Sequence, residues 1–158
     1  MQLWLVRHAV AAERDEFDGP DAERPLTEKG RRRFRDFCGW LAEQVPLPPT
    51  IITSPLVRAA ETASLLAKAA GLKRANITST ELLSPGVDLD ALLQFIRDQS
   101  TDFTALVGHE PDMSRCLSEL VGGGEFAFGK GFVAAIEFQS GPAKASGQLK
   151  WLVGPKFS

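Results

Sequence analysis

Short apolar runs alternate with amphipathic stretches along this 158-residue chain. Short apolar runs predict buried strands at residues 3–6 and 103–107, the segment 50–53 is expected to be a third strand, and a short extended segment is expected over 76–80. Two further strands, over 132–138 and 148–153, are separated by a polar turn containing glycine, which is typical of a hairpin. The chain is therefore expected to build one sheet whose last two strands form the hairpin.

Apolar residues at helical spacing fill the segments between these strands. Ser54 is expected to be an N-cap, and Pro55 suits the first position of a helix. The expected helices run from Thr27 to Pro46, from Pro55 to Gly71, over 89–99 after the cap Asp88, and from Pro111 to about Gly122. The alternation predicts a single domain over 1–158 of the α/β class, with three α/β/α layers and helices on both faces of a mostly parallel central sheet.

Composition and charge exclude several classes of partner. The net charge of −2 gives no reason to expect nucleic acid or an anionic membrane. No stretch approaches the roughly 20 apolar residues of a membrane span, and the first residues do not resemble a signal peptide. We therefore expect a cytoplasmic protein. Cys38 and Cys116 are expected to be buried free thiols, and no Cys/His cluster has the spacing of a metal site, so no metal is predicted.

The two histidines of the chain both follow predicted strands. His8 comes after the first strand and directly follows Arg7, and His109 comes after the strand over 103–107. In open α/β sheets, ligands bind just beyond the carboxyl ends of the strands, so two distant histidines at that edge can share one site. The alternative is that each histidine is a loop residue with ordinary hydrogen bonds.

Arg58 and a long charged loop point to the same edge. Arg58 lies in the first turn of the helix that follows the strand over 50–53, where free N–H groups attract anions. The alternative is a surface ion pair with Glu61, one helical turn away. Residues 11–26 form a charged irregular segment soon after His8, and we expect this loop to border the site. The expected ligand is a phosphate or a carboxylate.

Four segments in this order resemble the histidine phosphatase superfamily, whose fold is phosphoglycerate-mutase-like. They are Arg7-His8, Arg24-Pro25-Leu26-Thr27-Glu28-Lys29-Gly30, Ser54-Pro55-Leu56-Val57-Arg58-Ala59-Ala60-Glu61-Thr62-Ala63 and Val107-Gly108-His109-Glu110-Pro111. The amino-acid sequences of the second and fourth segments are most similar to those of SixA-type phosphohistidine phosphatases. One departure is Ala9, since the family commonly has glycine after the Arg-His pair, and this change could restrict the backbone beside His8.

The resemblance implies roles for individual residues. His8 would be the nucleophile that takes the phosphoryl group, and Arg7, Arg58 and His109 would surround the phosphoryl oxygens. Glu81 is a candidate general acid, since related enzymes often carry a catalytic glutamate after the third strand; its alternative is a loop residue. Asp18 and Glu13 are lesser candidates. Arg24 could contact substrate phosphate, or it could pair with Glu23, Asp21 or Glu28.

Without a metal ligand set, fixed cations must stabilise the transferred phosphoryl group. The sequence predicts a cofactor-independent phosphatase acting through a phosphohistidine intermediate. Its expected partner is a phosphorylated protein, a phosphohistidine phosphotransfer domain, because the short chain has no evident insertion to cover a small metabolite. A broad phosphatase of small phosphoesters is the alternative, and a mutase or a non-catalytic module that binds phosphorylated ligands would each fit less well. A monomer is expected.

Overall fold

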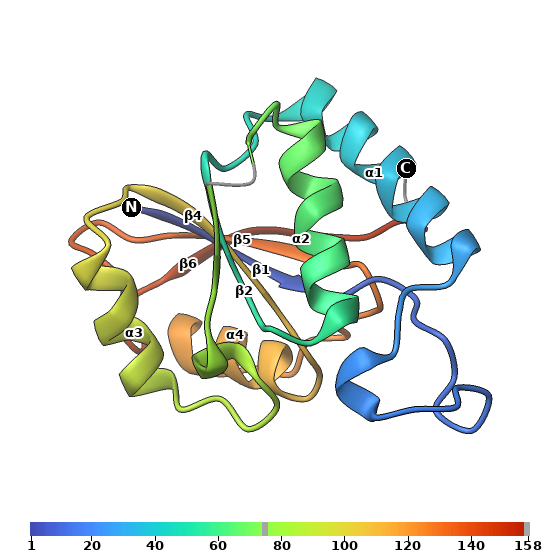
Figure 1. The fold of residues 1–158 in the computed structure, drawn as a ribbon. Coiled ribbons are helices and arrows are strands. Elements are labelled where there is room, and N and C mark those ends of the chain that lie inside the picture. The colour runs from blue at the N-terminus through green and yellow to red at the C-terminus, as the bar shows by residue number, and fades with distance from the viewer. Residues whose placement is uncertain (74–75, 157–158) are drawn as a thin grey trace.

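The computed structural model describes residues 1–73 and 76–156, and these form a six-stranded sheet in the order β3-β2-β4-β1-β5-β6 (Figure 1). The strands are β1 (Gln2–Arg7), β2 (Thr50–Thr53), β3 (Ile77–Ser79), β4 (Phe103–Gly108), β5 (Val133–Glu137) and β6 (Gln148–Val153). Strands β1, β2, β3 and β4 run parallel, whereas β5 is antiparallel to both β1 and β6. The expected mostly parallel sheet with a final hairpin is confirmed.

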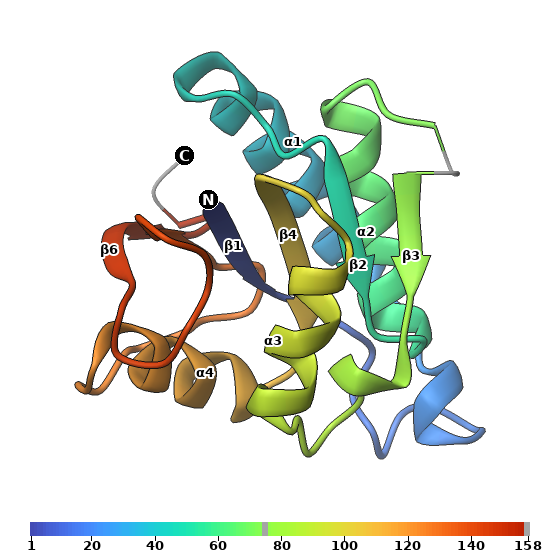
Figure 2. The same cartoon turned by 90° about the vertical axis from the view of Figure 1, so that its left-hand side faces the viewer.

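Helices cover both faces of this sheet. Helices α1 (Glu28–Gln44) and α2 (Val57–Ala69) pack on one face, and α3 (Leu89–Asp98) and α4 (Asp112–Val121) lie on the other (Figure 2). Each face has its own core, and β1 serves both: Leu3 and Leu5 point into the α3–α4 side, Trp4 and Val6 into the α1–α2 side. A strand buried on both faces explains why its apolar run is continuous rather than alternating.

Three helix ends have the capping residues that the sequence predicted. The Thr27 hydroxyl accepts a hydrogen bond from the Gly30 backbone N–H at 2.9 Å at the start of α1. Asp88 caps α3 through the backbone N–H groups of Asp90 and Ala91. Gly122, with φ of 91°, adopts the left-handed conformation that ends α4.

The start of α2 differs from the prediction. The helix begins at Val57, with Leu56 at the N-cap and no side-chain cap, so Ser54 and Pro55 precede it. Ser54 is fully buried and its hydroxyl bonds His109, while Pro55 is exposed. The Ser-Pro pair is typical of a helix start, but the serine side chain bonds His109 instead of capping the helix.

The charged loop of residues 11–26 leaves the sheet beyond the end of β1 and returns to α1 (Figure 1). An isolated bridge between Ala11 and Leu26 closes its base, and the short 3-10 helix Asp21–Glu23 lies within it. Cys38 and Cys116 are buried free thiols, as expected, and burial raises the pKa of each to about 12.

Candidate active site

Three parallel strands deliver polar residues to the same edge of the sheet. His8 follows β1, Ser54 follows β2 and His109 follows β4. The backbone holds these residues in register, because the His8 N–H donates to the Gly108 carbonyl at 3.0 Å and the Ser54 N–H donates to the Val107 carbonyl at 3.0 Å. The carboxyl ends of adjacent parallel strands meet at one edge, so residues a hundred positions apart become neighbours.

The two histidine rings lie next to each other, with centroids 5.2 Å apart, and both line a cavity of about 300 Å³. Five cationic and two anionic side chains contribute to its walls. Its lining residues are Arg7, His8, Ala11, Glu13, Arg14, Arg24, Arg58, Pro85, His109, Glu110 and Lys130. We call this the phosphate cavity, because a cleft with this excess of positive charge attracts anions.

A backbone carbonyl fixes the tautomer of His8. Its Nδ1 lies 2.8 Å from the Ala9 carbonyl oxygen. A carbonyl can only accept, so Nδ1 carries the ring proton and Nε2 keeps a free lone pair. Ala9 itself is nearly fully buried and donates its N–H to the Thr62 hydroxyl at 3.0 Å. Its φ is not positive, so this backbone does not need the glycine that the family commonly has.

Burial keeps both rings neutral. The pKa of His8 is lowered to about 3, chiefly by desolvation; the hydrogen bond to the Ala9 carbonyl acts in the opposite direction, and the neighbouring His109, Arg58 and Arg7 lower it further. The pKa of His109 is lowered to about 4 by desolvation, with Arg58 as the next contributor. At neutral pH each imidazole is therefore uncharged, and His8 has the unprotonated nitrogen that a nucleophile requires.

His109 is oriented by a serine from the neighbouring strand. Its Nε2 lies 2.8 Å from the Ser54 hydroxyl oxygen, and that hydroxyl also accepts from the Leu56 N–H at 3.3 Å. Nδ1 of His109 is buried and has no hydrogen-bond partner within the described residues. Buried polar nitrogens without partners are rare in folded proteins, so this one calls for an explanation.

Two arginines also have a buried side-chain nitrogen without a hydrogen-bond partner among the described residues. Arg7 donates Nη1 to the Phe128 carbonyl at 2.8 Å, and Arg58 donates Nη1 to the Asp21 carbonyl at 2.8 Å. In both side chains Nε is buried and no described residue accepts its hydrogen. Together with His109 Nδ1, these make three buried nitrogens without partners on residues that line one cavity.

Asp21, in the charged loop, is the acidic partner of these basic side chains. Its carboxylate lies 3.1 Å from Arg58 Nη2, 3.1 Å from Arg24 Nε and 3.0 Å from Arg14 Nη1. Burial alone would raise the pKa of this carboxyl, but the bond from Arg24 and the charge of Arg58 bring it below its usual value. The loop therefore borders the site, as expected. The ion pair of Arg58 is with Asp21, whereas Glu61 pairs with Arg31 at 2.6 Å.

The remaining candidates divide. Arg24 pairs with Asp21, which was one of the expected ion-pair partners, and it also lines the cavity; its contact with substrate phosphate stays a prediction. Glu13 lines the cavity as well. Glu81 is exposed, accepts a hydrogen bond from the Ser84 hydroxyl at 2.7 Å and is not among the lining residues. Asp18 is exposed on the loop and does not line the cavity either.

Sequence reasoning did not single out several residues at this site. Glu110 lines the cavity and accepts from the Ser114 N–H and hydroxyl at 2.9 and 2.8 Å. Its position directly after His109 is the signal that could have found it. Lys130 comes from a segment distant along the chain, and Arg14 lies in the charged loop over 11–26, where no pattern distinguishes it from the other charged residues. Within residues 1–73 and 76–156, no three His, Cys, Asp or Glu side chains are grouped as a metal site.

Comparison with known proteins places the chain in a family. The model of branch 1 of the histidine phosphatase superfamily matches residues 3–84. A protein from Picosynechococcus is 34% identical over 116 residues, which cover 72% of this chain and 68% of that relative. The chain therefore belongs to the histidine phosphatase superfamily.

Solved structures share the whole fold. The protein histidine phosphatase SixA, complexed with tungstate, superposes with a TM-score of 0.86 at 22% identity, over 99% of each chain. A mutant phosphoserine phosphatase from Entamoeba histolytica in complex with phosphoserine gives a TM-score of 0.70 at 16% identity, over 98% of each chain. The expected phosphoglycerate-mutase-like fold, similar to SixA, is confirmed. Among the described helices, none has the length and apolar character needed to cross a membrane.

Proposed function

We propose that this member of the superfamily is a phosphatase that dephosphorylates phosphohistidine on a protein through a phosphorylated His8. The observation that carries the proposal is the pairing of a neutral His8, whose Nε2 is unprotonated, with three buried nitrogens on Arg7, Arg58 and His109 that lack partners. A phosphoryl group in this cavity supplies the acceptor oxygens that those nitrogens lack.

The reaction takes two steps. In the first, the lone pair of His8 Nε2 attacks phosphorus and the bond from phosphorus to the substrate nitrogen breaks. The electron pair of that bond stays on the substrate ring, which leaves as neutral imidazole because its other nitrogen carries a proton taken from solvent. In the second, water attacks the phosphorylated His8, which releases inorganic phosphate and restores the free imidazole. The Nδ1 hydrogen bond to the Ala9 carbonyl holds the ring in one tautomer and stabilises the positive charge that develops on it.

Electrostatics supply most of the rate enhancement in this scheme. Phosphoryl transfer spreads negative charge over three equatorial oxygens, and fixed donors that meet that charge need no rearrangement during the reaction. Arg7 and Arg58 are held by the Phe128 carbonyl and by Asp21, so each guanidinium is oriented before substrate arrives. In the tautomer we assign to His109, the Ser54 hydroxyl donates to Nε2 and Nδ1 carries the hydrogen that meets phosphate.

The leaving group favours phosphohistidine over an alkyl phosphate. An alkoxide needs a proton from a general acid. A phosphohistidine ring can instead take a proton from water on its other nitrogen, since the ordinary pKa of imidazole is about 6.5, and it then leaves as neutral imidazole. Glu81 lies away from the cavity, and Glu110 is held by two hydrogen bonds from Ser114. Glu13 lines the cavity and is the carboxylate best placed to serve a phosphoester, which keeps a phosphatase of small esters as the second candidate.

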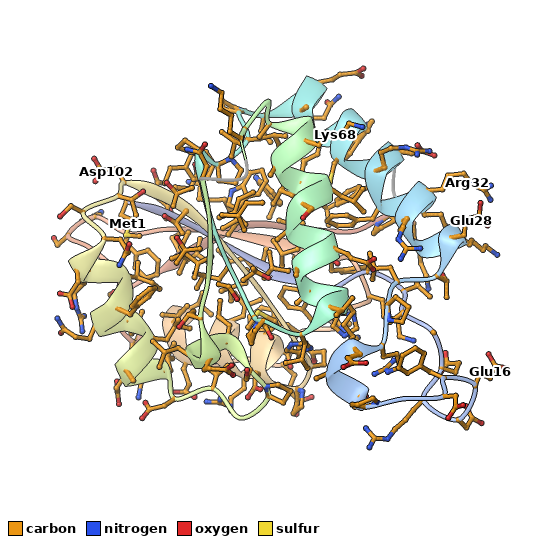
Figure 3. All side chains as sticks on the ribbon, viewed as in Figure 1. Met1, Glu16, Glu28, Arg32, Lys68 and Asp102 are labelled. Atoms are coloured by element: carbon orange, nitrogen blue, oxygen red, sulfur yellow. The ribbon has the colours of Figure 1, made fainter. Side chains whose placement is uncertain are left out.

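The test is phosphate release from a phosphohistidine phosphotransfer domain, with p-nitrophenyl phosphate assayed in parallel. Wild-type protein is expected to release phosphate from the domain, and His8→Ala is expected to release none. Arg58→Ala should lose at least about a hundredfold in rate, in line with loss of one donor to transition-state charge. Arg32→Ala is the matched control, since Arg32 projects from the outer side of α1 (Figure 3).

Each other outcome selects a different function. Turnover of p-nitrophenyl phosphate alone would indicate a phosphatase of small phosphoesters. Transfer of the phosphoryl group to a second hydroxyl without release of free phosphate would indicate a mutase. Binding of inorganic phosphate with no turnover and no labelling of His8 would indicate a binding module.

A further inference from the structure

A second cavity, of about 690 Å³, lies beside the phosphate cavity and is mostly apolar. It runs between the start of α1 and the segment over 127–132 that leads into β5. Val10, Phe34, Ala127, Phe128, Phe132 and Pro155 form its apolar walls. We call it the apolar groove. None of the reaction steps above uses it.

The apolar groove and the phosphate cavity share a wall. Lys130 lines both, and Ala9, which lines the apolar groove, directly follows His8. The same segment is bonded to the reacting residues, because the Phe128 carbonyl accepts from Arg7 Nη1 at 2.8 Å and the Gly131 N–H donates to the His8 carbonyl at 3.1 Å. A group that fills the apolar groove therefore lies next to a phosphoryl group on His8, within reach of one substrate molecule.

The charged residues around the apolar groove are all basic. Arg33, Lys130 and Lys156 contribute to its lining, and no described acidic residue does. Arg33 and Lys156 are exposed, so their charges face solvent at the rim. An occupant with acidic residues beside an apolar group complements this rim.

We propose that the apolar groove binds an apolar side chain of the protein that carries the phosphohistidine, with acidic residues of that protein at the basic rim. This inference rests on the proposed function, because it assumes that a protein is the substrate. A small sugar phosphate offers polar hydroxyl groups that would lose hydrogen bonds against these walls. A protein surface offers apolar and acidic side chains a few ångströms from its phosphorylated residue, which matches the adjacency of the two cavities.

Synthetic peptides test the preference without knowledge of the natural partner. Each carries one phosphohistidine flanked by glutamates, and a single leucine is placed at each of the four positions on either side of it in turn. The matched peptide has serine at the same place, and free phosphohistidine is the small substrate. At the productive position leucine should raise kcat/KM about tenfold over serine, the discrimination typical of one well-fitted aliphatic group.

Two pairs of variants link that preference to the apolar groove. Ala127→Trp places a large ring at an exposed wall position and should abolish the preference for leucine, while Ala127→Ser should retain it. Arg33→Glu should lower kcat/KM for the glutamate-flanked peptide about fivefold. Arg32→Glu makes the same charge change on the adjacent exposed residue outside the apolar groove and should leave kcat/KM near wild type. Free phosphohistidine should be hydrolysed equally by all four variants.

The results separate failure of this inference from failure of the proposed function. Hydrolysis of free phosphohistidine with no leucine preference at any position would overturn the role of the apolar groove and leave the activity standing. Equal losses on peptide and on free phosphohistidine in Ala127→Trp would overturn it as well, since the apolar groove would then support the site rather than the substrate protein. If the wild-type protein hydrolyses no phosphohistidine compound, both proposals are wrong.

Discussion

The neutral state of the two histidines can be tested directly by pH titration, because the chain has no others. We expect both imidazoles of the folded protein to stay mostly neutral as the pH falls from 8 to 5. Burial lowers the pKa of His8 to about 3 and that of His109 to about 4. A nucleophile that depends on a free Nε2 would then work across this whole range.

The expected difference from ordinary histidines is large. At pH 5, an imidazole with the usual pKa of about 6.5 is only about 3% neutral. With pKa values of about 3 and about 4, His8 and His109 remain about 99% and about 90% neutral. For His8, the fraction able to attack phosphorus at that pH is therefore about thirtyfold higher than in an exposed histidine.

The assay is NMR of protein labelled with nitrogen-15 in its histidines, recorded without ligand. The nitrogen shifts report both the protonation state and the tautomer of each ring, and His109→Asn assigns the two sets of signals. His8 should show its hydrogen on Nδ1, because that atom faces the Ala9 carbonyl. A titration midpoint near pH 6.5 for either ring, or a hydrogen on Nε2 of His8, would refute the reasoning.

The free energy of unfolding should depend on pH through the same two histidines. The unfolded chain takes up protons on both histidines near pH 6.5, whereas the folded chain does so only near their lowered pKa values. Below about pH 6.5 the unfolded state thus binds more protons than the folded state. The contribution of the two neutral histidines to the free energy of unfolding is complete above that pH and is lost as the pH falls toward 4. Each histidine contributes a slope of up to about 1.4 kcal/mol per pH unit.

Three substitutions probe other parts of the structure. Asp21→Asn removes the carboxylate from buried Arg58 and should raise KM for the phosphorylated substrate about tenfold, equivalent to about 1.4 kcal/mol, in steady-state assays; an unchanged KM would show that Arg58 needs no such partner. Gly30→Ala would bring a Cβ to 2.2 Å from the Val10 carbonyl oxygen and should lower the free energy of unfolding by about 2 kcal/mol in urea titrations, despite the better helix propensity of alanine; equal or greater stability would contradict that contact. Glu81→Gln should leave phosphate release from phosphohistidine within twofold of wild type, since Glu81 does not line the phosphate cavity, and a severe loss would restore it as the general acid.

Strand positions and the histidines at their ends could be predicted because the signal is local and then amplified by topology. A continuous apolar run marks a strand buried on both faces, and parallel strands bring their carboxyl ends to one edge. Those two rules place His8 and His109 together although they lie far apart in the sequence, and their rings are 5.2 Å apart. The family motifs then supplied the expected roles.

Contacts that depend on loop conformation could not be predicted. Asp21 is one of several acidic residues in the loop over 11–26, and only the folded path of that loop selects it for Arg58. Ser54 and Pro55 are typical of a helix start, yet the Ser54 hydroxyl forms a buried hydrogen bond with His109 and the helix begins only at Val57. Local helix propensity does not decide the structure in such places, because a buried tertiary hydrogen bond stabilises the fold more than the helix cap would.

The separate positions of the histidines at strand ends and of the rim residues in loops affect how the substrate range of this fold can change. His8, the proposed nucleophile, and His109 follow strands that run through the core, whereas loops such as 11–26 and 127–132 supply much of the rim. Mutations that reshape a rim loop can therefore alter what docks there without disturbing the two histidines at the strand ends. New substrate ranges are thus accessible through loop change alone, and redesign of this chain toward another phosphorylated partner should begin in those two segments.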